Sequence, residues 1–353
     1  PTSLVTFSMV TTRSHDSAKL KALVSGGAGF LGQHLVQQLL DTGKYEVVIF
    51  DIRDTGKCLA PVIVGDLRKL DQVIDAIKGV DVVFHCATAA PTSENSLNNE
   101  LMFSVNVEGA RNVVKACQIN KVTRLVFTSS ASVVFQGKAL VYVTEDHPYA
   151  TKPMDYYTQT KILAEQVVLA ANAKEGLMTV ALRPSAIFGE NDPIMVPTVV
   201  KQAKAGKMKF IIGDGKNEID WTYVGNVAQA HLDAADALAG SRSSQVAGKA
   251  FFITNQEPRQ FWTMMGDVCE GLNYSRPYIH LPFALIIFIA MLFEYVIRPL
   301  LKPIKTLNSD FTVNRILIAT TNRTFSSQAA KEHLGYQPKV NMDEALKRTL
   351  LSF

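Results

Sequence analysis

A tyrosine and a lysine four residues apart, Tyr157 and Lys161, form the pair in this chain best suited to move a proton. On a helix this spacing places both side chains on one face, one turn apart. A nearby ammonium group favours the phenolate form of a tyrosine, whose ordinary pKa of about 10 makes it a poor base at neutral pH. The pair predicts a general acid–base site, although two residues on a solvated helix face would show the same spacing.

A glycine-rich segment upstream predicts a dinucleotide site. After the apolar run 22–24, Gly26, Gly29 and Gly32 stand at Gly-x-x-Gly-x-x-Gly spacing, and Phe30 and Leu31 begin a helical pattern. A strand before the glycines and a helix after them are both expected from the spacing of apolar residues. Between them, backbone N–H groups can approach a pyrophosphate at the positive end of a helix dipole.

The next apolar run, 47–50, ends in Asp51, about twenty residues past the glycines, where a carboxylate can accept both hydroxyls of the adenosine ribose. A 2′-phosphate there would meet a like charge, which favours NAD over NADP. Arg53 leaves NADP as the alternative, because a nearby guanidinium could hold that phosphate. Asp51 would also suit the start of a turn.

Taken together, these motifs resemble the extended short-chain dehydrogenase/reductases from about residue 20 to the end of the chain. The resemblance implies an α/β fold with a Rossmann-type, doubly wound parallel sheet and a smaller C-terminal substrate lobe. It also implies that Ser130 is the active-site serine and that Asn106 orders Lys161 through water. The remaining cofactor residues that it implies are Asp66 and Leu67 near the adenine, His85 and Ala87 along the cofactor, and Pro184 and Ile187 near the nicotinamide. His85 would equally suit a buried histidine, and Asn106 a helix residue facing water.

The expected domain organisation follows the change in pattern after residue 190. Residues 1–19 are polar and predict a flexible extension, and 20–190 predict the NAD-binding domain, to which 207–232 return. Residues 191–206 and 233–353 are assigned to the substrate lobe.

Composition excludes several classes. With 353 residues and 47% hydrophobic content, the chain can bury a large core, and a net charge of +4 is too small to indicate nucleic-acid binding. Four cysteines, Cys58, Cys86, Cys117 and Cys269, have neither metal-ligand spacing nor a disulfide framework. We therefore expect no metal site. We also expect a reducing, cytosol-facing location.

A late apolar segment, 281–301, carries Glu294 and Arg298 as its only charged residues, and their i, i+4 spacing would let them pair. Its length of about 30 Å could just span a bilayer. A helix that is embedded without crossing is favoured, because a crossing would separate the C-terminal tail from the domain against which it should pack. A true span and a buried soluble helix are the alternatives.

Within the family, the segments 210–215, 221–224 and 252–258 are similar to the 3β-hydroxysteroid dehydrogenase branch, and especially to its plant-type sterol-4α-carboxylate 3-dehydrogenases. The resemblance implies NAD-dependent oxidation of a 3β-hydroxyl, with the C4 carboxylate lost as CO2. Arg183 and Lys152 are basic candidates for contact with that carboxylate. The alternatives are a 3β-hydroxysteroid dehydrogenase/isomerase, another reductase, a nucleotide-sugar epimerase, or a non-enzymatic sensor or scaffold.

The same resemblance implies a sterol substrate and an endoplasmic-reticulum membrane location, with the catalytic domain facing the cytosol. Other enzymes of sterol C4 demethylation and a second copy of the chain are the expected protein partners.

Overall fold

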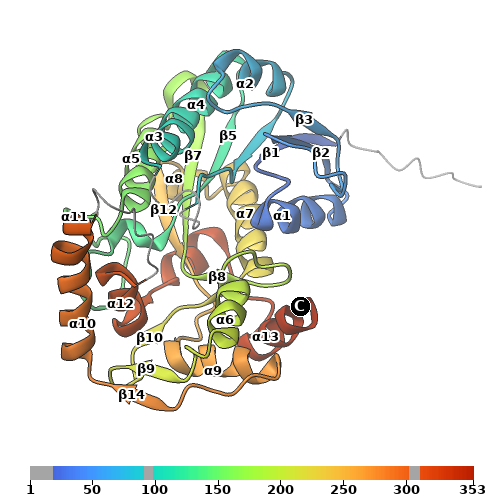
Figure 1. The fold of residues 1–353 in the computed structure, drawn as a ribbon. Coiled ribbons are helices and arrows are strands. Elements are labelled where there is room, and N and C mark those ends of the chain that lie inside the picture. Colours follow the sequence, from blue (N-terminus) through green and yellow to red (C-terminus); the bar gives the residue numbers. More distant parts are fainter. Residues whose placement is uncertain (1–18, 91–97, 302–310) are drawn as a thin grey trace, which may run out of the picture.

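The computed structural model describes residues 19–90, 98–301 and 311–353. The expected N-terminal extension therefore lies outside the described residues, apart from its last residue. At the centre is a seven-stranded sheet in the order β12-β7-β5-β4-β1-β2-β3 (Figure 1). Its strands, all paired in parallel, are β1 (Leu20–Ser25), β2 (Tyr45–Asp51), β3 (Val62–Val64), β4 (Val82–His85), β5 (Arg124–Thr128), β7 (Met178–Pro184) and β12 (Lys249–Ile253).

Helices cover both faces of this sheet, as expected for a parallel sheet whose strands are continuously apolar. Along β1, Ala22 and Val24 belong to the core beneath α1 (Phe30–Asp41) and α7 (Val224–Ala239). Leu23 points the other way, into the core beneath α2 (Leu70–Ala76), α4 (Gly109–Ile119) and α5 (Tyr156–Ala170). The doubly wound α/β fold is confirmed, and the strand order reverses between β1 and β4, where such sheets bind ligands.

A smaller lobe lies beyond the carboxyl ends of these strands. Its four-stranded sheet has the order β13-β10-β15-β6, formed by β13 (Arg259–Gln260), β10 (Glu218–Ile219), β15 (Arg323–Phe325) and β6 (Leu140–Val143). Two short pairs join β8 (Ile187–Phe188) to β11 (Thr222–Tyr223) and β9 (Phe210–Ile212) to β14 (Ile279–Leu281). The lobe's helices are α6 (Met195–Lys204), α9 (Phe261–Gly271), α12 (Val313–Thr320) and α13 (Met342–Leu351).

Shorter helical segments complete the described chain. They are α3 (Asn99–Phe103), η1 (Ser104–Glu108), η2 (Ala131–Val134), η3 (Lys174–Gly176), α8 (Ser243–Val246) and η5 (Ala330–Leu334).

The boundary between the two parts differs from the expected one in three places. Of residues 207–232, which were expected to return to the NAD-binding domain, the start of α7 does pack on the central sheet, but β9 and β10 pair with strands of the lobe. Strand β12, in the range assigned to the lobe, extends the central sheet beside β7, because its buried Phe251 and Ile253 belong to the same core as α7. Conversely, β6 leaves the N-terminal range and pairs with β15 in the lobe. The central domain therefore reaches residue 253, and it also receives the buried side chain of Tyr336 from the C-terminal tail.

The apolar segment forms one long helix through α10 (Phe283–Leu292), η4 (Phe293–Ile297) and α11 (Arg298–Leu301), with a π-helical turn at η4. One face packs against α12 (Figure 1). Ala290 is fully buried, while the rest of the helix is open: Phe288 is 59% exposed and Leu300 is 71% exposed. The alternative of a fully buried helix is therefore wrong. Among the described residues, 283–300 form the one helix long and apolar enough to cross a membrane, with a mean hydropathy of 2.0.

Candidate active site

A cavity of about 860 Å³ lies at the carboxyl ends of the central strands and extends toward the lobe. Its walls contain most of the residues that the sequence singles out: Gly26, Gly29, Phe30, Leu31, Gly32, Asp51, Arg53, Asp66, Leu67, Ala87, Ser130, Tyr157, Lys161, Pro184 and Ile187. At the lobe end it is lined by Asp192, Ile194, Met195 and Trp221. Neither His85 nor Asn106 reaches its surface among the described lining residues.

Two of the glycines are required by the close packing of the turn between β1 and α1. Gly26 has a φ of +74°, and a Cβ there would lie 2.6 Å from the Cα of Ala87. A Cβ on Gly32 would lie 2.1 Å from the carbonyl oxygen of Gly26. Gly29 is the N-cap residue of α1 and supplies no side-chain cap, so the first N–H groups of the helix stay available for an anion. The turn therefore fits a pyrophosphate.

The Asp51 carboxylate lies at the end of β2 and is tied to the glycine turn. Its Oδ2 accepts a hydrogen bond from the backbone N–H of Ala28 at 3.1 Å, and its Oδ1 lies 3.4 Å from the N of Arg53. The side chain is half-buried and lines the cavity, so free lone pairs remain for a ribose diol. The exposed Arg53 lines the same end.

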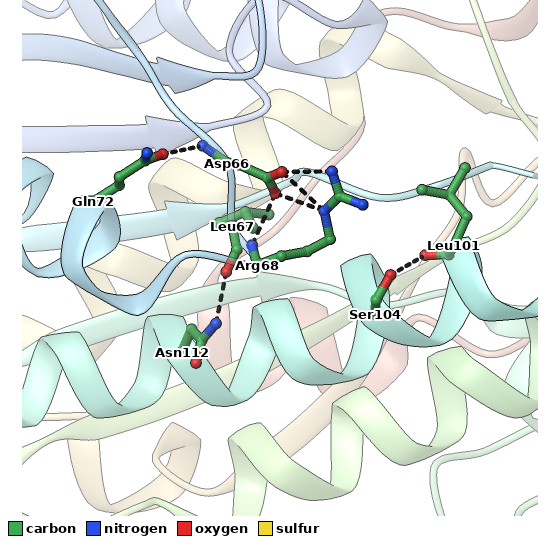
Figure 2. Close-up of polar contacts among 7 residues, drawn as sticks. All are labelled: Asp66, Leu67, Arg68, Gln72, Leu101, Ser104 and Asn112. Atoms are coloured by element: carbon green, nitrogen blue, oxygen red, sulfur yellow. Dashed lines mark hydrogen bonds and ion pairs between the residues drawn. The ribbon is translucent and has the colours of Figure 1, made fainter.

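Asp66, expected near the adenine, is held by a neighbour that the sequence analysis did not single out (Figure 2). Arg68 donates to both of its carboxylate oxygens, with distances between 2.6 and 3.0 Å, and these bonds lower the pKa of Asp66. The backbone N–H of Asp66 donates to Gln72, and Asn112 donates to the carbonyl oxygen of Leu67 at 2.8 Å. The loop after β3 is thus fixed at both residues.

Helix α5 brings the proton-transfer pair to the cavity. Tyr157 is partly buried, and burial followed by the charge of Asp155 raises its pKa to about 12, while a hydrogen bond with Thr88 acts in the other direction. Lys161 is buried, and its Nζ donates to the carbonyl oxygen of Thr128 at 2.6 Å. Burial lowers the pKa of Lys161 to about 8, against the opposing effects of Glu165 and Cys86. The ammonium is therefore the charged group one turn from the phenol below pH 8.

A buried histidine that the sequence analysis missed supports the lysine. His231 on α7 lies 2.6 Å through Nε2 from Thr128 Oγ1, and 2.8 Å through Nδ1 from the carbonyl oxygen of Val227. Because a carbonyl only accepts, Nδ1 carries the proton and the Thr128 hydroxyl donates to Nε2. Burial lowers the pKa of His231 to about 4, so the ring is neutral and fixes the residue whose carbonyl holds Lys161. No local pattern reveals this contact, since 103 positions separate the two residues.

Ser130 follows β5 at the cavity wall, and its Oγ accepts from the backbone N–H of Ser132 at 3.2 Å, which leaves its own proton available. Asn106, inside the π-helical turn η1, accepts from the N–H of Ala89 at 2.7 Å and donates to Thr160 Oγ1 at 3.0 Å. It therefore joins the segment after β4 to α5 beside Lys161. Among the described residues its side-chain contacts do not include Lys161 itself.

The structure places His85 behind the cavity wall. Its Nδ1 lies 2.7 Å from Ser25 Oγ, and burial, with the charge of Lys161, lowers its pKa to about 3. A neutral, fully buried imidazole here matches the alternative of a buried histidine, and it braces the ends of β1 and β4.

Comparison with known proteins identifies the group to which this site belongs. Residues 23–283 match the 3-beta hydroxysteroid dehydrogenase/isomerase family. The chain belongs to this family. Two relatives are named sterol-4-alpha-carboxylate 3-dehydrogenase, decarboxylating. The protein of Mus musculus is 44% identical over 94% of this chain and 91% of its own length. The protein of Homo sapiens is 45% identical over 94% of this chain and 88% of its own length. An Arabidopsis thaliana protein, 3beta-hydroxysteroid-dehydrogenase/decarboxylase isoform 1, is 43% identical over 94% of this chain and 79% of its own length.

Solved structures agree on the fold of this family member. An epimerase from Methanothermobacter thermautotrophicus superposes with a TM-score of 0.74 at 22% identity, covering 95% of this chain and 92% of its own. A UDP-glucose 4-epimerase of Thermus thermophilus, in complex with NAD, has a TM-score of 0.70 at 24% identity, with coverage of 94% and 98%. At these identities the likeness shows the fold alone.

The expectation that Arg183 contacts a substrate carboxylate in this family member is wrong. Its Nε and Nη2 donate to Glu165, at 3.1 and 2.6 Å, and Tyr149 donates to the same carboxylate. The pair is buried between β7 and α5, and neither residue is among the described lining residues of the cavity. Lys152 is exposed and also lies off the cavity wall, so among the described lining residues the basic ones are Arg53 and Lys161.

Proposed function

We propose that this family member oxidises the 3β-hydroxyl of a 4α-carboxysterol with NAD and releases the C4 carboxylate as CO2. The observation that carries the proposal is the placement of Tyr157, Lys161 and Ser130 together in a cavity of about 860 Å³. The chain's curated relatives, which it matches over nearly its whole length, are named for this reaction.

The fit of NAD rests on this chain's own residues. The cradle formed by Gly26, Gly29 and Gly32 has no side chain in the path of a pyrophosphate. The Asp51 carboxylate, held by the N–H of Ala28, suits a ribose diol and would repel a 2′-phosphate. When bound, the nicotinamide ring would supply the acceptor for the hydride that leaves C3.

The protein's part in the oxidation is to position and deprotonate the alcohol. The Tyr157 phenolate would take the proton of the 3-hydroxyl, while the Ser130 hydroxyl donates a hydrogen bond to the same oxygen. The Lys161 ammonium, anchored on the Thr128 carbonyl, stabilises the phenolate in a site where little water screens its charge. Asn106 holds the helix that carries the pair.

Loss of CO2 then follows from the product of the oxidation. A ketone at C3 makes the substrate a β-keto acid, so the C4–carboxylate bond can break with its electron pair passing into the C3–C4 enolate. The enolate oxygen is the former hydroxyl oxygen, which already lies beside Tyr157 and Ser130. Protonation at C4 completes the ketone, and no separate decarboxylation catalyst is required.

Incubation with NAD and a 4α-carboxy-3β-hydroxysterol tests the proposal directly. NADH and CO2 should appear in equal amounts, and the matching 4α-methyl sterol should react much more slowly. A preference for a Δ5-steroid without a C4 substituent, with a product that absorbs as a conjugated enone, would instead establish the isomerase activity that the family's name also includes.

We further propose that the α10–α11 helix lies in the plane of the endoplasmic-reticulum membrane, on the cytosolic side. Its open face carries Leu285, Phe288, Tyr295 and Leu300, while its other face packs against α12. An apolar helix with one face on protein and the rest exposed is suited to the bilayer interface, where a sterol substrate is dissolved. The other enzymes of sterol C4 demethylation are partners on the same surface, and a homodimer remains a prediction.

A further inference from the structure

The single acid of the apolar helix contacts the helix beside it. In residues 283–297 Glu294 is the only charged side chain, and its Oε2 accepts a hydrogen bond from the backbone N–H of Val313 at 2.8 Å. Val313 is the first residue of α12. Glu294 therefore contacts another element, and the ion pairs found among the described residues do not include the expected one with Arg298, one turn along.

This contact has a physical reason at both ends. The first N–H groups of a helix lack intrahelical partners, and a carboxylate at this end also interacts favourably with the helix dipole. Thr312 caps the N–H of Arg315, so Glu294 supplies the acceptor that the N–H of Val313 would otherwise lack. For Glu294, a charge on a membrane-facing helix is costly unless it is hydrogen-bonded to protein. It lies in the π-helical turn η4, a local departure from the regular helix of the kind often found at functional positions.

The next residue of α12 carries the connection to the catalytic helix. Asn314 donates through Nδ2 to Asp155 Oδ2 at 3.1 Å. The other carboxylate oxygen of Asp155 accepts from the N–H of Thr158 at 2.8 Å, which makes Asp155 the N-cap of α5. Tyr157 is the second residue of that helix. One carboxylate thus joins the start of α12 to the start of the catalytic helix.

We propose that Glu294 and Asn314 are positioning residues that connect the membrane-facing helix to the N-terminus of α5 and so set the position and charge environment of Tyr157. Figure 1 shows α12 beside the α10–α11 helix, inside the lobe. This proposal rests on the proposed function in one respect, because the oxidation of a 3β-hydroxyl is the activity that the test measures.

The electrostatic consequence has a defined sign. Asp155 raises the pKa of Tyr157, second to burial, and the hydrogen bond from Asn314 disperses part of that carboxylate's charge. Without this bond more charge acts on the phenol, its pKa rises further, and the pH at which the phenolate forms increases. The other charged groups on α5 are Lys161 and Glu165. The elements packed against α5 carry Glu100, Glu108, Arg111, Lys115 and Arg183, and the substitutions below leave all of these groups in place.

The test compares variants of the full chain in lipid nanodiscs, with kcat for oxidation followed against pH. Asn314→Ala should move the acidic limb of the kcat–pH profile to higher pH by about 0.5 to 1 pH unit. This shift would lower kcat at pH 7 about 3- to 10-fold. Asp155→Asn keeps an N-cap oxygen but removes the charge, so the limb should move to lower pH. In the Asp155→Asn background, Asn314→Ala should cause no further shift.

Glu294 is tested by a matched pair of substitutions. Glu294→Gln retains an oxygen that can accept from the N–H of Val313, and it should preserve the wild-type pH profile. Glu294→Leu removes the acceptor while keeping an apolar side chain suited to lipid, and its limb should move in the same direction as that of Asn314→Ala.

The proposal is overturned if Asn314→Ala lowers kcat without moving the limb, or if its shift persists in the Asp155→Asn background. If Glu294→Leu does not fold, the Asn314→Ala comparison decides alone, with NADH affinity as the check on folding. The profile can be recorded with any 3β-hydroxysteroid that the enzyme oxidises. A failure to release CO2 would therefore count against the proposed function, whereas the pH profiles of the variants could still be compared.

Discussion

Some groups around Tyr157 raise the pKa of its phenol, and others lower it. Burial and the charge of Asp155 raise this pKa to about 12, whereas a hydrogen bond with Thr88 lowers it. The Lys161 ammonium lies one turn away on the same helix. A bound nicotinamide carries a positive ring and adds to the effect of Lys161, so the phenolate becomes accessible in the loaded site. Proton transfer is thus expected to depend strongly on both residues.

Replacing Tyr157 with Phe keeps the ring and removes the oxygen that accepts the proton. Turnover should fall by at least the roughly 10² to 10⁴ attributed to general acid–base catalysis. NADH affinity, measured by fluorescence titration, should be retained, because the glycine turn and Asp51 are untouched. A variant with near wild-type turnover would remove Tyr157 from the mechanism.

Loss of the Lys161 charge should be visible in the pH dependence. Because a positive charge lowers the pKa of the phenol, Lys161→Ala should raise that pKa by about 1–3 units and move the acidic limb of kcat to higher pH. Since burial sets the pKa of Lys161 at about 8, its support is present below pH 8 and is lost above it. An unchanged limb in the variant would contradict this role.

Cofactor choice depends on Asp51 and Arg53. Asp51→Ala removes the ribose acceptor and the charge that repels a 2′-phosphate, while Arg53 remains at the same end of the cavity. The ratio of kcat/KM for NAD to that for NADP should therefore fall. The Asp51→Ala, Arg53→Ala double variant serves as the control and should lose the gain with NADP. A ratio that stays constant in the single variant would show that Asp51 only shapes the turn.

At the scale of elements, a buried ion pair fastens the catalytic helix to the sheet. Arg183 on β7 and Glu165 on α5 are both almost completely buried, and Tyr149 donates to the same carboxylate. The burial of the guanidinium between two elements, and its absence from the described cavity lining, assign Arg183 to the fold rather than to substrate binding.

Breaking that pair should destabilise the protein. Arg183→Leu leaves the Glu165 carboxylate buried without its cation, and the free energy of unfolding should fall by about 3–5 kcal/mol. Urea denaturation measures the change. The Arg183→Leu, Glu165→Leu double variant, which removes both charges, should recover much of the loss. If the single variant unfolds like the wild type but binds the carboxysterol poorly, the substrate-binding role would be restored.

At the scale of the whole molecule, the chain leaves the lobe for the apolar helix and then returns to it. Strand β14, just before α10, pairs with β9, and α12 packs against β9 and α9. Helix α13 then packs on α9 near the C-terminus. Both ends of the apolar segment therefore belong to one globular body, which favours a helix that is embedded without crossing.

This arrangement gives a topology test. A glycosylation acceptor tag placed after Phe353 should remain unmodified in microsomes, because the C-terminus stays on the cytosolic side with the catalytic domain. A matched protein with a known single crossing should be modified under the same conditions. Glycosylation of the tag on this chain would establish a true span.

Several elements were predictable from local pattern because their residues carry the signal themselves. The strand 20–25 and the helix 30–41 occur where the spacing of apolar residues predicts them. Gly26 and Gly32 occur at this turn because a Cβ at either position would clash with neighbouring backbone atoms. Strand β12 was assigned to the wrong part, because an apolar run predicts a strand but contains no information about its neighbour in the sheet.

The sequence alone determined the cofactor turn and the spacing of Tyr157 and Lys161, because each depends on residues within a few turns or one strand of each other. These motifs together carried the resemblance that implied the fold class. Only the tertiary structure decided which groups act on that pair. His231 lies 103 positions from Thr128, and Asn314 lies 159 from Asp155. Contacts between residues so far apart follow from how the helices pack on the sheet and the lobe, and packing of this kind leaves no local periodicity to detect.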